Sequence, residues 1–215
     1  MVFDTRQDAG RQLGHRLQAL GVGVDLVAGL PRGGVVVAAE VADVLQRPLE
    51  ALVVRKIGHP WQREFAVGAL AEGNVLMLDR AAMAAAPLAR AELEMIIREE
   101  KERLRQYCLK FHRERRTGFA GNRVLLVDDG LATGATAEAA VCSARNQQAR
   151  QIILAVPVAS DSAFNRLARM ADQVIALVTD RNFQAVGQYY KHFLPTGDAE
   201  VLALLHQQHA DYRPA

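Results

Sequence analysis

The sequence has little cysteine. Cys108 and Cys142 are its only two cysteines, and they lie far apart in segments with a helical pattern. Neither is part of a CxxC pair or lies beside a cluster of histidines. We therefore interpret both side chains as core thiols.

A long uncharged apolar segment is also missing. No apolar run approaches the roughly 20 residues that a helix needs to cross a membrane. Residues 1–10 mix Asp and Arg and contain no apolar stretch. The formal net charge of +2 is close to balanced, so it gives no reason to expect nucleic acid or a membrane as the main partner. We expect a cytoplasmic protein.

Two familiar nucleotide-binding motifs are absent. Gly21 and Gly23 precede an apolar segment without the third glycine of a GxGxxG dinucleotide fingerprint, and the chain contains no GxxxxGK(S/T) phosphate loop. Internal repeats and low-complexity tracts are absent as well. The 215 residues, of which 50% are hydrophobic, therefore fit a single domain over residues 1–215.

The sequence does contain an alternation of short apolar runs and amphipathic helical segments. The strands that we expect are 24–30, 49–54, 75–78, 124–127, 152–156 and 174–178. The helices that we expect between and around them are 6–20, 35–46, 138–147, 162–170 and 198–209. This alternation predicts an α/β fold with an open, mainly parallel twisted sheet flanked by helices.

The most informative stretch is 124–136. Its four apolar residues predict a buried strand, and Asp128 and Asp129 lie side by side at the carboxyl end of that strand. The following Thr133-Gly134-Ala135-Thr136 offers hydroxyls and the free amide groups of a helix start, which suit a phosphate dianion. An ordinary βα turn capped by Asp is the alternative, but a cap needs only one acidic residue and two adjacent carboxylates repel each other. The spacing indicates a site for a sugar phosphate.

The same stretch resembles the phosphoribosyl-pyrophosphate (PRPP) binding motif of type I phosphoribosyltransferases. The resemblance implies that Asp128 and Asp129 hold the ribose hydroxyls and orient Mg²⁺ through water. It also implies that a short loop cradles the 5′-phosphate, formed by Ala132, Thr133, Gly134, Ala135 and Thr136. Ala135 stands where glycine is frequent in that family, but its backbone N–H remains.

Two further segments fit this resemblance. Pro31-Arg32-Gly33-Gly34 follows the first strand; its glycines allow close backbone approach and Arg32 offers donors for phosphate oxygens, although a tight packing turn is the alternative. Arg55 and Lys56 follow the next strand, where ligands bind in open α/β sheets, although a solvated strand end is the alternative. The resemblance implies that Pro31, Arg32, Gly33, Gly34, Arg55 and Lys56 bind pyrophosphate. Arg32, Arg55 and Lys56 would act catalytically by stabilising its developing charge.

Residues 57–74 contain three glycines among polar side chains, and we expect a long loop there. A loop of this length in a compact domain is usually functional. We interpret it as a lid that closes over PRPP, with His59 and Arg63 reaching the leaving group. The alternative is that Trp61 and Phe65 fill a gap in the core.

Two more segments depart from the α/β rhythm. Residues 88–116 predict a long charged helical excursion whose glutamates offset much of its basic charge, so a solvated face with ion pairs is favoured over a nucleic-acid surface. Such a helix could equally pack against a second subunit, and we expect a homodimer. Residues 180–215 are the candidate for a small hood and a C-terminal helix. Phe183 and Tyr189 are candidates for the acceptor site, with a plain aromatic cluster as the alternative.

The chain from residue 30 to about residue 205 resembles a family of bacterial proteins described only as predicted phosphoribosyltransferases. Outside the phosphate motifs it does not look closely like the adenine, hypoxanthine-guanine, orotate or uracil enzymes. The resemblance implies a Mg²⁺-dependent pentosyltransferase that transfers ribose 5-phosphate from PRPP to an unidentified nitrogenous acceptor, such as a nucleobase, and releases pyrophosphate. A PRPP-sensing regulatory protein without turnover and a ribose-phosphate hydrolase are the alternatives.

Overall fold

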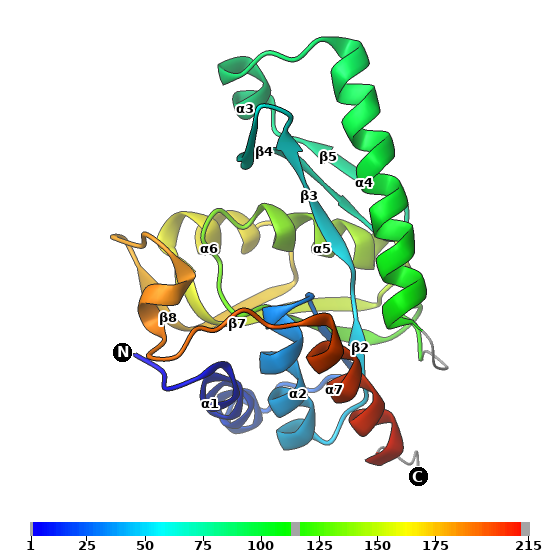
Figure 1. Cartoon of the computed structure of the whole chain (residues 1–215). Helices are drawn as coiled ribbons and strands as arrows, with labels where there is room; N and C mark the ends of the chain where they lie inside the picture. Colours follow the sequence, from blue (N-terminus) through cyan, green and yellow to red (C-terminus); the bar gives the residue numbers. More distant parts are fainter. Residues whose placement is uncertain (1, 113–116, 212–215) are drawn as a thin grey trace.

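The computed structural model describes residues 2–112 and 117–211, apart from the side chains of 63, 64 and 209–211 (Figure 1). A five-stranded sheet with the order β2-β1-β6-β7-β8 lies at the centre. Its strands are β1 (Leu26–Gly29), β2 (Leu49–Ala51), β6 (Arg123–Val127), β7 (Gln151–Ser160) and β8 (Gln173–Asp180). All neighbouring strands in this sheet are parallel, which confirms the predicted α/β class.

Helices cover both faces of the sheet (Figure 1). One face carries α1 (Arg6–Ala19), α2 (Gly33–Leu45) and α7 (Asp198–Asp211), and the other carries α5 (Ala135–Asn146) and α6 (Asp161–Leu167). Neighbouring side chains of a strand point to opposite faces. Leu126 therefore packs into the core under α5, while Leu125 packs into the core under α2. A strand between two such cores must be apolar at every position, as residues 124–127 are.

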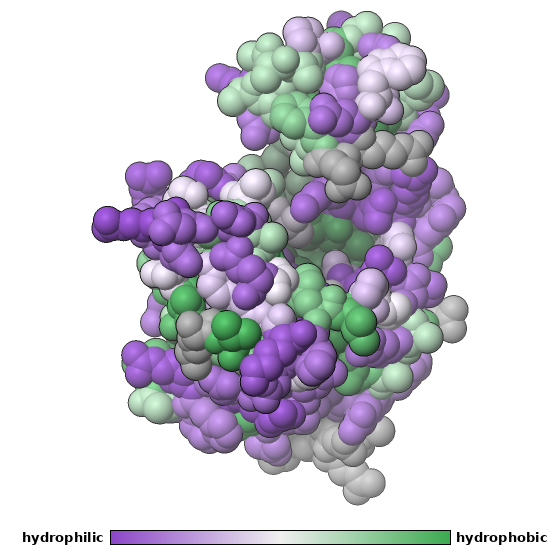
Figure 2. Space-filling model, turned by 60° about the vertical axis from the view of Figure 1, so that its left-hand side comes forward, coloured by the Kyte–Doolittle hydropathy of each residue, from purple (hydrophilic) through white to green (hydrophobic). Residues whose placement is uncertain are grey.

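A second unit, residues 54–111, rises above the main body on the side of α5 (Figure 1). It contains an antiparallel sheet of β3 (Val54–His59), β4 (Gln62–Ala71) and β5 (Val75–Leu78), followed by α3 (Arg80–Ala85) and α4 (Arg90–Phe111). Ile57, Val67 and Leu70 form its small core together with residues of α4. We call this the β3–α4 unit. Figure 2 shows the surface hollowed between it and the main body.

The prediction of a loop over residues 57–74 is wrong. Most of this segment is the β3–β4 hairpin, with Ile57 opposite Gly68. Gly68 lies inside β4, and a Cβ atom there would overlap the carbonyl oxygen of Met77 on β5. This glycine therefore marks a place where β4 and β5 approach each other closely. Trp61 does not fill a gap in the core, since it lies at the hairpin tip with 82% of its surface exposed, whereas Phe65 packs against the unit's small core.

The expected strand 49–54 also needs correction. The parallel strand β2 ends at Ala51, and Val54 already belongs to β3 of the other sheet. Arg55 and Lys56 therefore lie within β3 and not at the end of a core strand. The long helix expected over 88–116 is α4, and residues 113–116 lie outside the described residues.

The tail after β8 packs against the main body. It contains the short helix η1 (Val186–Tyr189), and Phe3 pairs with Tyr190 beside it. Phe183 and Tyr189 stack with ring centroids 5.2 Å apart, and Tyr189 is buried in a cluster with Phe3. This arrangement matches the alternative of an aromatic cluster. Within the described residues, no helix combines the length and the apolar character that crossing a membrane requires.

Candidate functional site

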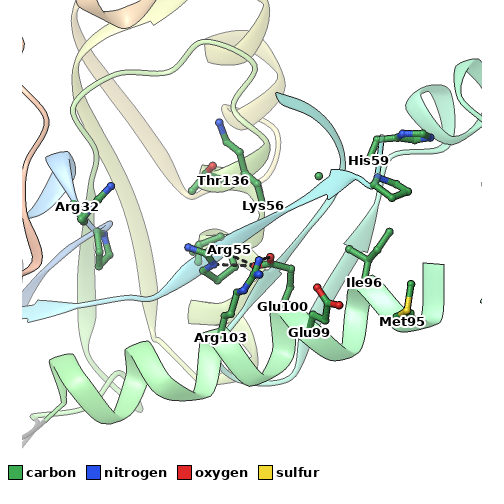
Figure 3. A pocket seen from close by; sticks show the side chains of 14 residues that line it. Arg32, Arg55, Lys56, His59, Met95, Ile96, Glu99, Glu100, Arg103 and Thr136 are labelled. Atoms are coloured by element: carbon green, nitrogen blue, oxygen red, sulfur yellow. Dashed lines mark hydrogen bonds and ion pairs between the residues drawn. The ribbon is translucent and has the colours of Figure 1, made fainter. Parts of the chain in front are cut away.

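Two adjoining cavities lie where the loops after β1 and β6 meet the β3–α4 unit. The larger one, of about 640 Å³, opens between β3, α4 and the turn after β1 (Figure 3). The smaller one, of about 170 Å³, lies over the loop between β6 and α5. Lys56 and Thr136 line both cavities, so the two form one continuous site.

Asp128 and Asp129 line the smaller cavity directly after β6. The backbone N–H of Asp129 donates to the Asp128 carboxylate at 2.9 Å. Burial raises the pKa of both carboxyl groups, and the charge of Asp129 raises the pKa of Asp128 further, while Lys56 and Arg6 act in the opposite direction. Burial thus makes the pair costly to ionise, and a cation or hydrogen-bond donors would stabilise its charged form.

Arg6 is a site residue that sequence reasoning missed. It lies in the first turn of α1, and its Nε donates to Oδ2 of Asp129 at 2.8 Å. Its Nη1 donates to the carbonyl of Leu194 at 2.7 Å, and its guanidinium lies 3.8 Å from the ring centroid of Phe193. No local motif marks this arginine, because its partner is 123 residues away in the sequence.

The glycine turn packs directly against the acidic pair. A Cβ atom at Gly33 would overlap the Asp129 carboxylate, and one at Gly34 would lie 2.8 Å from Oδ1 of Asp128. Only glycine lets the amino end of α2 come this close, and the positive end of the helix dipole then favours the carboxylate charge. The peptide bond between Pro31 and Arg32 in this turn is cis. The two sequence motifs therefore form one site.

The loop before α5 is held from β7 and α6. Ser160 Oγ donates to the carbonyl of Ala132 at 2.7 Å, and Arg166 contacts both the Thr133 carbonyl and the Glu138 carboxylate. Gly134 has φ of 78°, a left-handed conformation that favours glycine. In the described part of the chain no side chain caps α5, so its first amide groups face the small cavity ready for an anion. Ser160 and Arg166 were not predicted as supports of this loop.

The three predicted cations differ in their surroundings. Figure 3 shows Arg55 directed toward Glu100, with Lys56 beside Thr136 on the other side of β3. Arg55 Nε and Nη2 lie 3.0 Å from Oε2 of Glu100, which also pairs with Arg103. Arg32 is half exposed and lies 3.9 Å from Asp198. Lys56 is the one of the three whose charge acts on both aspartates.

The other candidates lie at the edges of the site or beyond it. His59 lines the larger cavity, whereas the side chain of Arg63 lies outside the described residues. Phe183 and Tyr189 line neither cavity; the hydroxyl of Tyr189 donates to Asp180 at 2.7 Å. Between them in sequence, Val186 does line the smaller cavity.

Comparison with known proteins gives consistent matches. A family model described as "Phosphoribosyl transferase domain" matches residues 7–189. The Mycobacterium tuberculosis (strain H37Rv) protein "Putative phosphoribosyl transferase Rv0571c" is 45% identical over 215 residues, which are 100% of this chain and 48% of that protein. A protein of strain CDC 1551 matches equally. The chain therefore spans about half the length of the curated relatives it matches.

Solved structures match as well. The crystal structure of TT1426 from Thermus thermophilus is 41% identical, with a TM-score of 0.79, and the match covers 97% of this chain and 99% of that one. AQ2163 from Aquifex aeolicus is 11% identical with a TM-score of 0.51, over 85% of this chain and 78% of that one, and this likeness concerns the fold alone.

Proposed function

Because this chain belongs to the phosphoribosyl transferase family, we propose that it transfers the ribose 5-phosphate of PRPP to a nitrogenous acceptor and releases pyrophosphate. One observation carries this proposal. The acidic pair, the glycine turn and the open amino end of α5 surround one small cavity, and Lys56 and Thr136 connect that cavity to a larger one. The first cavity suits the phosphorylated sugar. The second has room for the acceptor and for the pyrophosphate that leaves PRPP.

The small cavity supplies the clamp on the sugar phosphate. Asp128 and Asp129 accept hydrogen bonds from the two ribose hydroxyls, which offsets the cost of burying the carboxylates. The amide groups of Ala135 and Thr136 and the Thr136 hydroxyl bind the 5′-phosphate. Arg166 and Ser160 hold the loop in shape, so the clamp is formed before the ligand binds.

Lys56 stabilises the pyrophosphate that leaves, because it lies between the two cavities and on the same side as the acidic pair. Arg32 joins it from the turn after β1. Arg55 is held by Glu100, so we assign it to the wall of the larger cavity. This assignment revises the expectation that Arg55 and Lys56 act alike.

The acidic pair also fits Mg²⁺. Two adjacent carboxyl groups that line the small cavity offer the oxygen ligands that this ion prefers, and the cavity leaves room for water. Bound Mg²⁺ would neutralise charge on the donor. Asp128 and Asp129 would hold it through water, as the family resemblance implies.

We assign the acceptor to the larger cavity and the hood to the β3–α4 unit, in place of the tail. Met95 and Ile96 give this cavity an apolar wall, while Glu99 and Arg103 add polar groups of both signs. A flat heterocycle with polar edges suits such a lining. A cytoplasmic location and a homodimer stay predictions.

One experiment separates this function from its alternatives. The protein is incubated with PRPP, Mg²⁺ and a panel of nucleobases, and pyrophosphate release is measured. Release that depends on a base supports transfer; release without a base supports a hydrolase; PRPP binding without release supports a sensor. Absence of PRPP binding in calorimetry would overturn the proposal.

Variants sharpen the experiment. Asp129→Asn should abolish release and weaken PRPP binding while the protein stays folded. Asp25→Asn is the matched control, because Asp25 pairs with Arg123 and Arg150 away from both cavities and should not affect release.

A further inference from the structure

A second cluster of side chains that can bind a metal lies at the C-terminal end of α4, outside the site described above. Cys108 lies in the last turn of the helix and His112 is its C-cap, one helical turn further on. The His112 N–H donates to the Cys108 carbonyl at 2.9 Å, so the i, i+4 spacing places both side chains on one face. Glu72, directly after β4, faces them.

The geometry brings three different donor atoms together. His112 Nε2 lies 3.0 Å and 3.1 Å from the two carboxylate oxygens of Glu72. The Cys108 Sγ, a His112 ring nitrogen and a Glu72 oxygen all lie within 4.8 Å of one another. The side chains of Glu72 and His112 are only 11% and 14% exposed. We propose that these three residues bind a zinc-class divalent transition-metal ion, with water as the fourth ligand.

The ligand types favour this class of ion over others. Thiolate and imidazole are typical zinc ligands, and a carboxylate completes many zinc sites with an open fourth position. Mg²⁺ and Ca²⁺ select oxygen donors and would not use the sulfur of Cys108. The proposed site is therefore chemically distinct from the acidic pair of Asp128 and Asp129.

The position of the site gives the ion a structural role. The Glu72 carboxylate also accepts the Val53 N–H at 2.6 Å, at the link between β2 and β3. The Glu72 carbonyl accepts from Ser143 Oγ of α5 at 2.6 Å. An ion that joins Glu72 to Cys108 and His112 would thus fasten α4 to the main body at the base of the β3–α4 unit.

Cobalt titration tests the proposal directly. Protein treated with a chelator and desalted is titrated with Co²⁺ and then with Zn²⁺. We expect a thiolate-to-cobalt charge-transfer band that Zn²⁺ removes. Cys108→Ser should abolish the band, and His112→Gln should weaken Zn²⁺ binding by at least the about 10- to 100-fold that even outer-shell changes cause. Cys142→Ser is the matched control and should keep the band, because Cys142 lies on α5 outside the cluster.

Thermal unfolding with and without Zn²⁺ provides the second measurement. Zn²⁺ should raise the melting temperature of the wild type and of Asp129→Asn, but not that of Cys108→Ser. Absence of a cobalt band in folded wild-type protein would overturn the proposal. So would a band, or a Zn²⁺-induced shift in melting temperature, that survives in Cys108→Ser. Because Asp129→Asn should leave this site intact, failure of the metal site is separable from failure of the proposed function.

Discussion

Replacing Lys56 with Met tests whether Lys56 binds the ligand while the neighbouring Arg55 has a structural role. The Lys56 side chain lines both cavities, and its charge acts on Asp128 and Asp129. A hydrogen bond from an ammonium group to a phosphate oxygen contributes about 1.5–3 kcal/mol. Loss of that bond should weaken PRPP binding by about 10- to 150-fold, while the retained methylene stem preserves packing.

Arg55→Met is the matched comparison, because Arg55 is the neighbouring residue on the same strand. Adjacent side chains of a strand point to opposite faces, and Arg55 faces Glu100. Its removal leaves the Glu100 carboxylate, which is 8% exposed, with Arg103 as a partner. We expect a loss of about 1–3 kcal/mol in the free energy of unfolding and a much smaller change in PRPP affinity.

The two variants are compared by calorimetric titration with PRPP in the presence of Mg²⁺ at one ionic strength, and by urea unfolding. Fixed salt matters because screening weakens every charge interaction in the site. Equal losses of affinity in the two variants would refute the assignment of Arg55 to the cavity wall. Wild-type affinity in Lys56→Met would refute the role of Lys56.

Two further predictions concern the acidic pair. In Gly33→Ala the new methyl group would overlap the Asp129 carboxylate, so PRPP binding should weaken and the free energy of unfolding should fall by about 1–3 kcal/mol. Gly197→Ala is the control, because nothing lies within 4 Å of its added Cβ atom. It should match the wild type in calorimetric titration with PRPP and in urea unfolding. Burial raises the pKa of Asp128, so its contribution to stability is fully present below the ordinary Asp pKa and is lost as pH rises through the raised pKa. Asp128→Asn should therefore become more stable relative to wild type as pH rises, by at most about 1.4 kcal/mol for each pH step of one. Asp25→Asn should become less stable relative to wild type as pH rises, because Arg123 lowers the pKa of Asp25. Urea unfolding across pH 3–8 measures both variants, and a difference in unfolding free energy between Asp128→Asn and wild type that does not change with pH would contradict the burial argument.

Local pattern was enough to predict the parallel sheet and the position of the acidic pair at the end of one of its strands. A strand buried on both faces requires an unbroken apolar run, and residues 124–127 contain one that fits β6. The acidic pair and residues 132–136 follow such a strand directly, so their position at its end needs no long-range information. The structure places Gly33 and Gly34 beside them because parallel strands β1 and β6 are neighbours and end at the same edge.

The hairpin 54–71 could not be predicted in the same way. Glycine in a sequence indicates a turn as readily as a close strand contact, and only the position of Met77 on β5 shows that Gly68 belongs to the second kind. The alternation of Phe65, Val67 and Ala69 was the signal for β4, but the glycines around it favoured a loop. Whether such a glycine lies in a turn or at a close contact between strands depends on how distant segments pack, and the local sequence pattern does not contain that information.

The role of the tail follows from contacts behind the acidic pair. The Tyr190 hydroxyl donates a hydrogen bond to the Asp129 carbonyl at 2.6 Å. Arg6 binds the Asp129 side chain, and its guanidinium packs over the ring of Phe193. Ring stacking between Tyr190 and Phe193, 5.1 Å apart, joins the two contacts. Tyr190 and Phe193 therefore fix the backbone and, through Arg6, the side chain of Asp129. Substitutions in this tail should change the orientation of one carboxylate, and through it the affinity for the sugar, without any contact with an acceptor.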